Sequence, residues 1–395
     1  MLNRRRFLHN ASLVSLAPLI PGFLPGSLYA TETQTNGRIL VVIQLSGGND
    51  GLNTVIPFND DTYGKARTTL RIEQKDTLKL TDSLGLHPAM KPAAELFESG
   101  RLAIVQGVGY PNPNRSHFES MSIWQHARTD LAQHDHIGWL GRACDLQRRA
   151  AGTPDSYFLG AEELPVAIRG RRAQVVSMNS AQDLNLVNPV EPSGTVTTGS
   201  SDISAFIEQS LDESYLAAKQ FQETTPALGE TSAAYPSSRL SRHLQLVSKL
   251  IKFGGGTRVY YTSQSGYDTH SSQLVAHRQL LAEFSGALKA FLDDLKQAGL
   301  DDRVVVLAFS EFGRRVEENG SAGTDHGAAG PVFLAGSKVQ SGILGEHPSM
   351  TDLDDGDLKM RFDFRQVYAT LLDRWLAVDT KAVLGGEFSL LPLIA

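Results

Sequence analysis

Two segments of the chain are continuously apolar and rich in β-branched residues, which limits how they can pack. They are Ile39–Ile43 and Val304–Phe309. Such runs are typical of strands buried on both faces of a sheet, whereas a strand with one wet face alternates apolar and polar residues. A helical pattern over 274–298 directly precedes the second run. Because strands and helices alternate, we predict a three-layer α/β/α sandwich with a mostly parallel central sheet.

The same alternation continues along the rest of the chain. We expect further strands at 102–108, 258–262 and 331–335, and further helices at 88–99, 240–253 and 364–378. Gly100 and Gly299 follow two of the predicted helices, in the position where glycine commonly ends a helix. In sheets of this kind, ligands gather outside the carboxyl ends of the strands.

Polar side chains suited to catalysis follow the predicted strands. They are Asp50, Ser116, Asp268, His270 and Glu311. Two glycine-flanked segments, 266–270 and 324–327, each hold an aspartate and a histidine within two positions of each other. Carboxylate oxygens and neutral imidazole nitrogens are the ligands that a zinc-like ion prefers. We therefore predict a metal-centred hydrolase site at this edge of the sheet.

The first thirty residues are predicted to be an export signal. The segment Arg4-Arg5-Arg6-Phe7-Leu8 fits the twin-arginine pattern, and a short apolar stretch interrupted by prolines follows it. We expect residues 1–30 to be cleaved, 31–395 to form a single domain, and the protein to be periplasmic or secreted. Its export partner would be the twin-arginine translocase. No later segment is apolar and long enough to predict a membrane span.

Composition excludes some partners. The net charge is -6, and no block rich in lysine or arginine follows the predicted signal. Nucleic acid is therefore not expected as a partner. The single cysteine, Cys144, rules out an intramolecular disulfide. Residues 150–240 are rich in proline, serine, threonine and glycine, and we interpret this region as a variable insertion or lid on the substrate side.

Five short motifs carry a resemblance to a known family. They are Leu45-Ser46-Gly47-Gly48-Asn49-Asp50-Gly51, Asn114-Arg115-Ser116-His117-Phe118, Gly266-Tyr267-Asp268-Thr269-His270, Ser310-Glu311-Phe312-Gly313-Arg314 and Thr324-Asp325-His326-Gly327. With them the chain resembles the domain-of-unknown-function 1501 family of exported bacterial proteins. The order of the motifs also resembles the alkaline-phosphatase-like superfamily of phosphatases, phosphodiesterases and sulfatases, and this likeness spans roughly residues 37 to 393.

The superfamily resemblance implies two divalent ions beside a serine or threonine nucleophile. It assigns Asp268, His270 and His326 to one ion, for which zinc is expected, and Asp50 and Glu311 to the other. Phe312 stands where the superfamily has a histidine. The second site would therefore be depleted, and would hold magnesium or calcium or be empty. In a second mapping, Asp325 and His326 form the metal-binding pair and His347 is the last ligand.

The resemblance also implies an ester substrate. Ser116 matches the nucleophile by position, and Arg115 or Arg314 could hold a phosphate or sulfate oxygen. The function expected from this arrangement is hydrolysis of a phosphate or sulfate ester. The alternative is a non-catalytic binding or assembly protein that keeps the fold and at most one metal, which the loss of a ligand at Phe312 would favour.

Simpler interpretations exist for single members of the motifs. Asp50 suits a turn, Ser116 suits a helix N-cap, and Glu311 could form an ion pair with a neighbouring arginine. The loose group of His117, His126, His134 and His136 is interpreted as surface histidines.

Overall fold

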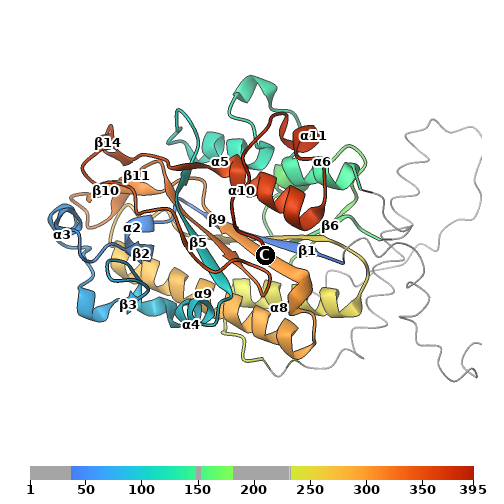
Figure 1. The fold of residues 1–395 in the computed structure, drawn as a ribbon, viewed down its shortest axis with the longest axis horizontal. Coiled ribbons are helices and arrows are strands. Elements are labelled where there is room, and N and C mark those ends of the chain that lie inside the picture. Colours follow the sequence, from blue (N-terminus) through green and yellow to red (C-terminus); the bar gives the residue numbers. More distant parts are fainter. Residues whose placement is uncertain (1–36, 148–152, 181–230, 232) are drawn as a thin grey trace, which may run out of the picture. The chain divides into compact units, whose positions relative to one another are not determined.

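The computed structural model describes residues 37–147, 153–180, 231 and 233–395, shown in colour in Figure 1. The chain divides into two units, Met1–Gly37 and Arg38–Ala395, and every element below belongs to the second. The predicted export signal lies outside the described residues, and so does most of the predicted insertion. Within the described residues, no helix combines the length and apolar character that a membrane crossing needs.

In the described part of the chain, the central sheet has nine strands and is mostly parallel, as the sequence predicts. Its order is β13 (Gly342–Leu344), β5 (Leu102–Gly109), β12 (Gly330–Ala335), β9 (Val304–Phe309), β1 (Ile39–Ser46), β8 (Val259–Ser265), β6 (Ser156–Leu159) and β7 (Val175–Met178). The ninth strand, β16 (Phe362–Asp363), pairs with β5. Only β12 runs antiparallel to its two neighbours. Figure 1 shows helices on both sides of this sheet.

One face of the sheet is covered by α4 (Lys91–Glu98), α8 (Arg239–Phe253) and α9 (Gln273–Gln297). Successive side chains of a strand point to opposite faces, so every second residue of β1 packs here. The Ser238 hydroxyl accepts a hydrogen bond from the Ser241 amide and caps the start of α8. Gly254 ends that helix in the left-handed conformation, which glycine adopts without steric cost.

The opposite face is covered by α5 (His117–His126), α6 (Trp139–Asp145), α10 (Phe364–Thr370) and the π-helix η10 (Leu371–Leu376). The Trp124 ring of α5 stacks between Phe309 and Phe364, at centroid distances of 4.9 and 4.5 Å. A buried aromatic pair of this kind contributes about 0.5–1.5 kcal/mol beyond the burial of its area. This packing fixes α5 against β9 and so fixes the start of α5 near the ends of the strands.

Smaller elements extend from the carboxyl side of the sheet. They are α2 (Gly51–Thr54), β2 (Val55–Ile56), α3 (Asp61–Ala66), β3 (Leu78–Lys79), β4 (Gly85–Leu86), β10 (Arg314–Glu318), β11 (Thr324–His326), β14 (Leu353–Asp354) and β15 (Asp357–Leu358). The helix α11 (Thr380–Leu384) lies elsewhere, beside α6, and belongs to the core on that face of the sheet. The antiparallel pair β10–β11 follows β9 and brings the end of β11 back beside the start of β10.

The predicted insertion begins with strands of the main sheet. Both β6 and β7 lie within residues 150–240; β6 pairs in parallel with β8, and β7 pairs in parallel with β6. Because residues 181–230 lie outside the described part of the chain, the predicted domain and insertion limits stay predictions.

Parallel strands bring distant loops to one edge of the sheet. β1 lies between β8 and β9, and Ser46 and Ser265 are register partners at the ends of their strands. The loops after these three strands, 47–50, 266–272 and 310–313, therefore emerge together, as the fold prediction requires.

Candidate metal centre

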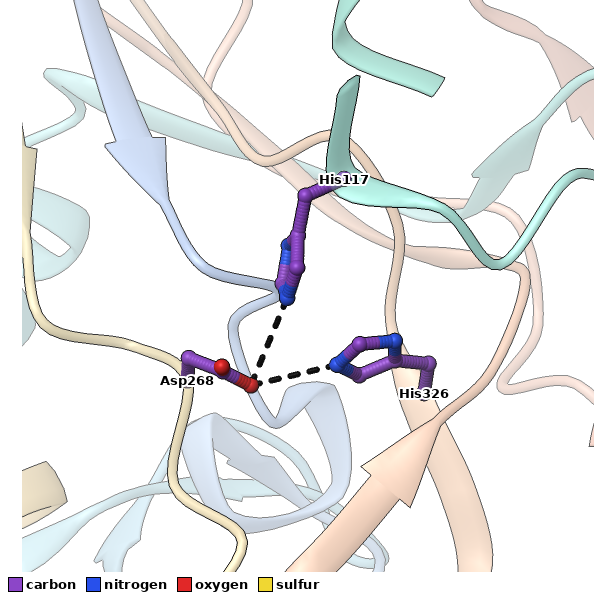
Figure 2. A group of neighbouring side chains, drawn as sticks. All are labelled: His117, Asp268 and His326. Atoms are coloured by element: carbon purple, nitrogen blue, oxygen red, sulfur yellow. Dashed lines mark hydrogen bonds and ion pairs between the residues drawn. The ribbon is translucent and has the colours of Figure 1, made fainter. Parts of the chain in front are cut away.

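Three side chains from distant parts of the chain converge at this edge. The ring nitrogens of His117 and His326 and a carboxylate oxygen of Asp268 all lie within 4.8 Å of one another. Figure 2 shows both rings turned toward the Asp268 carboxylate. His117 opens α5, Asp268 follows β8, and His326 ends β11. Two imidazoles and one carboxylate form a donor set typical of a divalent zinc-like ion.

One oxygen atom, Asp268 Oδ1, is the centre of the cluster. It lies 3.1 Å from His326 Nε2, 3.4 Å from His117 Nε2 and 3.0 Å from His270 Nε2. The Nε2 atoms of His270 and His326 are themselves 2.9 Å apart. The structure thus brings together Asp268, His270 and His326, which the sequence assigns to one ion, and adds His117 to them.

The other ring nitrogen of each cluster histidine is held by an acceptor. His117 Nδ1 lies 2.8 Å from a carboxylate oxygen of Glu311, and His326 Nδ1 lies 2.8 Å from the Arg115 carbonyl oxygen. Carboxylates and carbonyls only accept hydrogen bonds, so each Nδ1 carries the proton. In the neutral ring, Nε2 then has no proton and turns a lone pair toward Asp268.

His270 is held in the same way. Its Nδ1 lies 3.2 Å from Asp325 Oδ1, and Asn319 donates a hydrogen bond to that same oxygen at 3.1 Å. The His270 Nε2 lone pair therefore also faces the cluster. Asp325 acts as an orienting partner of His270, a role that neither sequence mapping gives it.

With these protonation states, no proton lies between the Nε2 lone pairs of the histidines and Asp268 Oδ1. His117 Nε2 is buried and has no hydrogen-bond partner among the described residues, although it lies 3.4 Å from Asp268 Oδ1. Two acceptors that face each other repel unless a cation or a proton lies between them. A divalent cation at the cluster would satisfy these nitrogen and oxygen atoms together, so the residues fit a metal.

The electrostatics of the cluster favour an ionised Asp268 and a basic His117. Burial alone would raise the pKa of Asp268, but the hydrogen bond and the positive charge of Arg314 outweigh it and lower this pKa to about 2. The hydrogen bond to Glu311 raises the pKa of His117, whereas burial lowers the pKa of His326. A carboxylate behind a ligating histidine increases the basicity of that ligand.

Arg314 is buried and positions Asp268. Its guanidinium donates to the carbonyls of Gly48 and Thr324, both at 2.7 Å, and also to the carbonyls of Gly47 and Tyr267. It reaches Asp268 Oδ1 at 2.8 Å. With every nitrogen engaged inside the protein, this arginine is not free to hold a substrate oxygen, so the geometry favours a positioning role over the predicted substrate contact.

The glycines before Asp50 allow three loops to approach closely. Gly47 and Gly48 have φ values of 120° and 76°, in the range that favours glycine. A Cβ at Gly47 would lie 2.4 Å from the Asp268 amide nitrogen, and a Cβ at Gly48 would lie 2.3 Å from the Phe312 ring. Phe312 itself packs against both His117 and His326, at centroid distances of 4.9 and 4.8 Å. It therefore orients two cluster histidines instead of supplying a ligand.

Glu311 supports the cluster from behind. Its Oε1 accepts hydrogen bonds from the Gly47 amide and His117 Nδ1, both at 2.8 Å, and Ser310 Oγ donates to Oε2 at 3.1 Å. The structure thus gives this residue, predicted as a ligand of the second ion, the place of an outer partner of His117.

We expect Glu311→Gln to weaken zinc binding by about 10–100-fold, because the amide holds the proton on His117 Nδ1 less strongly than a carboxylate does. Competition with a fluorescent zinc chelator would measure the dissociation constant. Glu317→Gln, which changes an exposed glutamate on the neighbouring strand β10, is the matched control. Equal zinc affinity in the two variants would contradict the supporting role.

Sequence comparison identifies the family. The family described as "Protein of unknown function (DUF1501)" matches residues 37–387. The chain belongs to the DUF1501 family. No curated protein matches the sequence.

The DUF1501 chain is similar in fold to solved structures of the alkaline phosphatase superfamily. The C-terminal periplasmic domain of EcEptC from Escherichia coli, in complex with Zn, is 10% identical over 91% of this chain and 92% of that one, with a TM-score of 0.42. The PsFucS1 sulfatase from Pseudoalteromonas sp. is 12% identical over 89% and 70%, with a TM-score of 0.40. A Vibrio parahaemolyticus protein in that superfamily is 12% identical over 90% and 70%, also at 0.40. Likeness at this level assigns no reaction to the chain.

Asp50 lies in a buried ion pair in this DUF1501 chain. Arg67 Nη1 and Nη2 reach its two carboxylate oxygens at 2.7 and 3.1 Å, and both side chains are fully buried. Gln273 donates a further hydrogen bond to Asp50. Burial would raise the pKa of Asp50, but the Arg67 charge outweighs burial and lowers it. With its oxygens engaged, Asp50 does not join the metal cluster, and the geometry favours a structural role over the predicted metal contact.

Arg115 and Ser116 flank the cluster without entering it. The Arg115 side chain is paired with Asp355 and Asp357, at 2.9 and 2.8 Å, and only its backbone carbonyl reaches His326. Ser116 is the N-cap of α5, and its hydroxyl accepts from the Glu119 amide at 3.5 Å. This matches the simpler interpretation of Ser116, and its role as nucleophile stays a prediction.

Two residues of the site were not predicted from the sequence. The sequence predicts a surface position for His117, yet its ring is held between Glu311 and Asp268. Its position directly after Ser116, in a motif that follows a predicted strand, was the signal that could have identified it. Arg67 carries no such signal, because it lies at the end of the short helix α3 and meets Asp50 only in the folded chain.

Proposed function

We propose that this protein is a metal-dependent hydrolase of phosphate or sulfate esters. The observation that supports the proposal most is the shared orientation of three histidines. His117, His270 and His326 each have Nδ1 held by an acceptor and Nε2 turned toward Asp268. Such orientation is characteristic of histidines that bind a metal. The donor set favours zinc over magnesium or calcium, which prefer oxygen ligands.

A bound divalent cation would polarise an ester oxygen and offset the charge that develops on it. The residues of the chain prepare the site for that chemistry. His117, Asp268 and His326 would hold the ion, and His270 is placed to join them. Arg314 keeps Asp268 ionised and fixed, while Glu311 and Asp325 fix two of the imidazole rings.

One ion per chain fits the arrangement better than two. The residues assigned to the second ion have other partners: Asp50 is paired with Arg67, and Glu311 with His117. We infer that the second site of the superfamily is replaced here by these two pairs. A single ion is also compatible with the alternative function, a non-catalytic binding or assembly protein with one metal. A second observation favours this alternative, because neither Arg115 nor Arg314 is free to bind a phosphate or sulfate oxygen.

Ser116 is the proposed nucleophile. Its oxygen would form a bond to phosphorus or sulfur while the bond to the leaving alcohol breaks. The proton of the serine hydroxyl would pass to the departing alcohol, and water would then cleave the serine ester, which releases phosphate or sulfate and restores the serine hydroxyl. The hydroxyl lies at the N-terminus of α5, where the helix dipole favours negative charge.

We expect Ser116→Ala to lower kcat for ester hydrolysis by about a thousandfold or more while zinc binding is unchanged. The assay would use zinc-loaded protein and a panel of aryl phosphates, phosphodiesters and sulfates. Ser321→Ala, at an exposed serine, is the control. Full turnover by Ser116→Ala would exclude the nucleophile role, and no turnover of any ester by the zinc-loaded wild type would favour the non-catalytic alternative.

For localisation, we propose that the twin-arginine translocase exports the folded protein to the periplasm or beyond. Folded export would allow the ion to be bound before the protein leaves the cytoplasm. The proposal rests on the motif at residues 4–8 alone.

A further inference from the structure

An open cleft with a volume of about 360 Å³ lies directly beside the metal cluster. One wall is formed by His117 and by Glu311, the carboxylate that orients it. Its lining comes from the end of β1, with Gln44 and Ser46, and from α5, with Phe118, Met121 and Gln125. A group attached to an ester at the cluster could therefore extend into this space.

The floor of the cleft is a fixed network of amide and hydroxyl groups. The Val166 amide donates to Gln125 Oε1 at 2.9 Å, which turns the Gln125 NH₂ group toward Gln44 Oε1 at 3.1 Å. Tyr261 also donates to Gln44 Oε1, at 2.6 Å, and Gln44 Nε2 donates to Ser46 Oγ at 2.7 Å. The Gln125 side chain also hydrogen-bonds to Tyr261, whereas the Gln44 NH₂ group has two N–H bonds and uses one of them in these contacts. The floor thus presents oriented, uncharged polar groups.

Part of the cleft lining is apolar and exposed. Phe118 directly follows His117 and is 90% exposed, which is unusual for an aromatic residue beside a polar cluster. Met121, one turn along α5, and the side chain of Val166 are apolar lining residues as well. A flat aromatic ring at the mouth of a cleft suits a ligand with a flat C–H face.

The charge of the lining restricts the ligand further. The described lining holds no lysine or arginine, and its one carboxylate is Glu311, already bonded to His117. An anionic ligand would lose water in this cleft and gain no cationic partner, which is unfavourable. A cationic ligand would find no free carboxylate. The geometry and the charge together favour a neutral ligand rich in oxygen.

We propose that this cleft binds the alcohol part of the ester, and that this part is a neutral sugar unit. A pyranose ring has hydroxyl oxygens that can accept from Gln44, which Gln125 holds in place, and a C–H face that can pack on Phe118. The assignment to the leaving alcohol rests on the proposed hydrolase function. The binding of the sugar itself does not, because none of the cleft's donors depends on turnover. Phe118 and Gln125 would then determine substrate specificity.

The test is binding of the zinc-loaded, full-length protein to an array of oligosaccharides. The array would hold neutral gluco-, galacto-, manno- and xylo-oligosaccharides together with uronic acid oligosaccharides. We expect retention on neutral glycans in preference to carboxylated ones. Calorimetric titration with the neutral glycan that binds best should then give a dissociation constant about tenfold weaker for Phe118→Ala, because the apolar contact is lost. Gln125→Leu should weaken binding in the same direction.

Two matched variants serve as controls. Val275→Ala removes another exposed apolar side chain, and Gln279→Leu removes another helical glutamine; neither residue lines the cleft. Both should bind the glycan as the wild type does. Retention on no neutral glycan, preference for carboxylated glycans, or an affinity unchanged by Phe118→Ala would overturn the proposal. Glycan binding without ester turnover would reject the hydrolase function and leave the sugar site standing, whereas ester turnover without glycan binding would do the reverse.

Discussion

Replacing His326 with alanine is expected to reduce bound zinc from about one ion per chain to almost none. The substitution removes a proposed ligand, and removal of an outer partner alone typically costs about 10–100-fold in metal affinity. The loss should therefore exceed that of Glu311→Gln, and any hydrolysis should disappear with the ion. Elemental analysis of protein dialysed against zinc-buffered solution would measure the metal content.

His136→Ala is the matched control for this experiment. His136 is exposed and lies outside the cluster, so its replacement should leave the zinc content unchanged. If His326→Ala kept a full equivalent of tightly bound zinc, the ion would have to be elsewhere in the chain. The zinc content of His117→Ala would tell which ligand set binds the ion. The observed cluster predicts a loss of zinc, whereas the ligand set predicted from sequence, which contains His270 and not His117, predicts no loss.

Replacing Arg67 with methionine is expected to lower the free energy of unfolding by about 3–5 kcal/mol, because the charge of Asp50 would remain buried without its partner. The Asp50–Arg67 pair is fully buried and bidentate. Arg67 also donates to the carbonyls of Arg315 and Val316, which ties α3 to β10. Denaturant unfolding followed by circular dichroism would measure the change.

Two further variants interpret the Arg67 result. Arg71→Met removes one member of an exposed pair with Glu73 and should cost less than about 1 kcal/mol. Adding Asp50→Asn to Arg67→Met removes the unpaired charge and should recover part of the lost stability. A loss for Arg67→Met as small as that for Arg71→Met would show that the buried pair contributes little, and would reopen the assignment of Asp50 to a metal.

The fold could be predicted because its strands are buried on both faces. Ile39–Ile43 and Val304–Phe309 are apolar throughout, since helices cover both sides of β1 and β9. The strands β6 and β7 escaped prediction, because each has four residues and both lie in a segment rich in proline and polar residues.

The site could be predicted in part, because parallel strands place their following loops at one edge. This reasoning finds Asp268, His270 and Glu311, and motif order adds His326. It does not predict which hydrogen-bond, ion-pair or packing partners a side chain has in the folded protein. The pairing of Asp50 with Arg67 depends on the path of α3, and the packing of Phe312 on His117 and His326 depends on the conformation of Gly48. Such contacts exist only in the folded chain.

Anomalous X-ray diffraction from zinc-loaded crystals, measured on both sides of the zinc absorption edge, tests the central claim most directly. The expected result is one anomalous peak per chain, with His117, Asp268 and His326 around it and no peak beside the Asp50–Arg67 pair. A peak bound by Asp50, or no peak at the His117–Asp268–His326 cluster, would contradict the proposed metal centre.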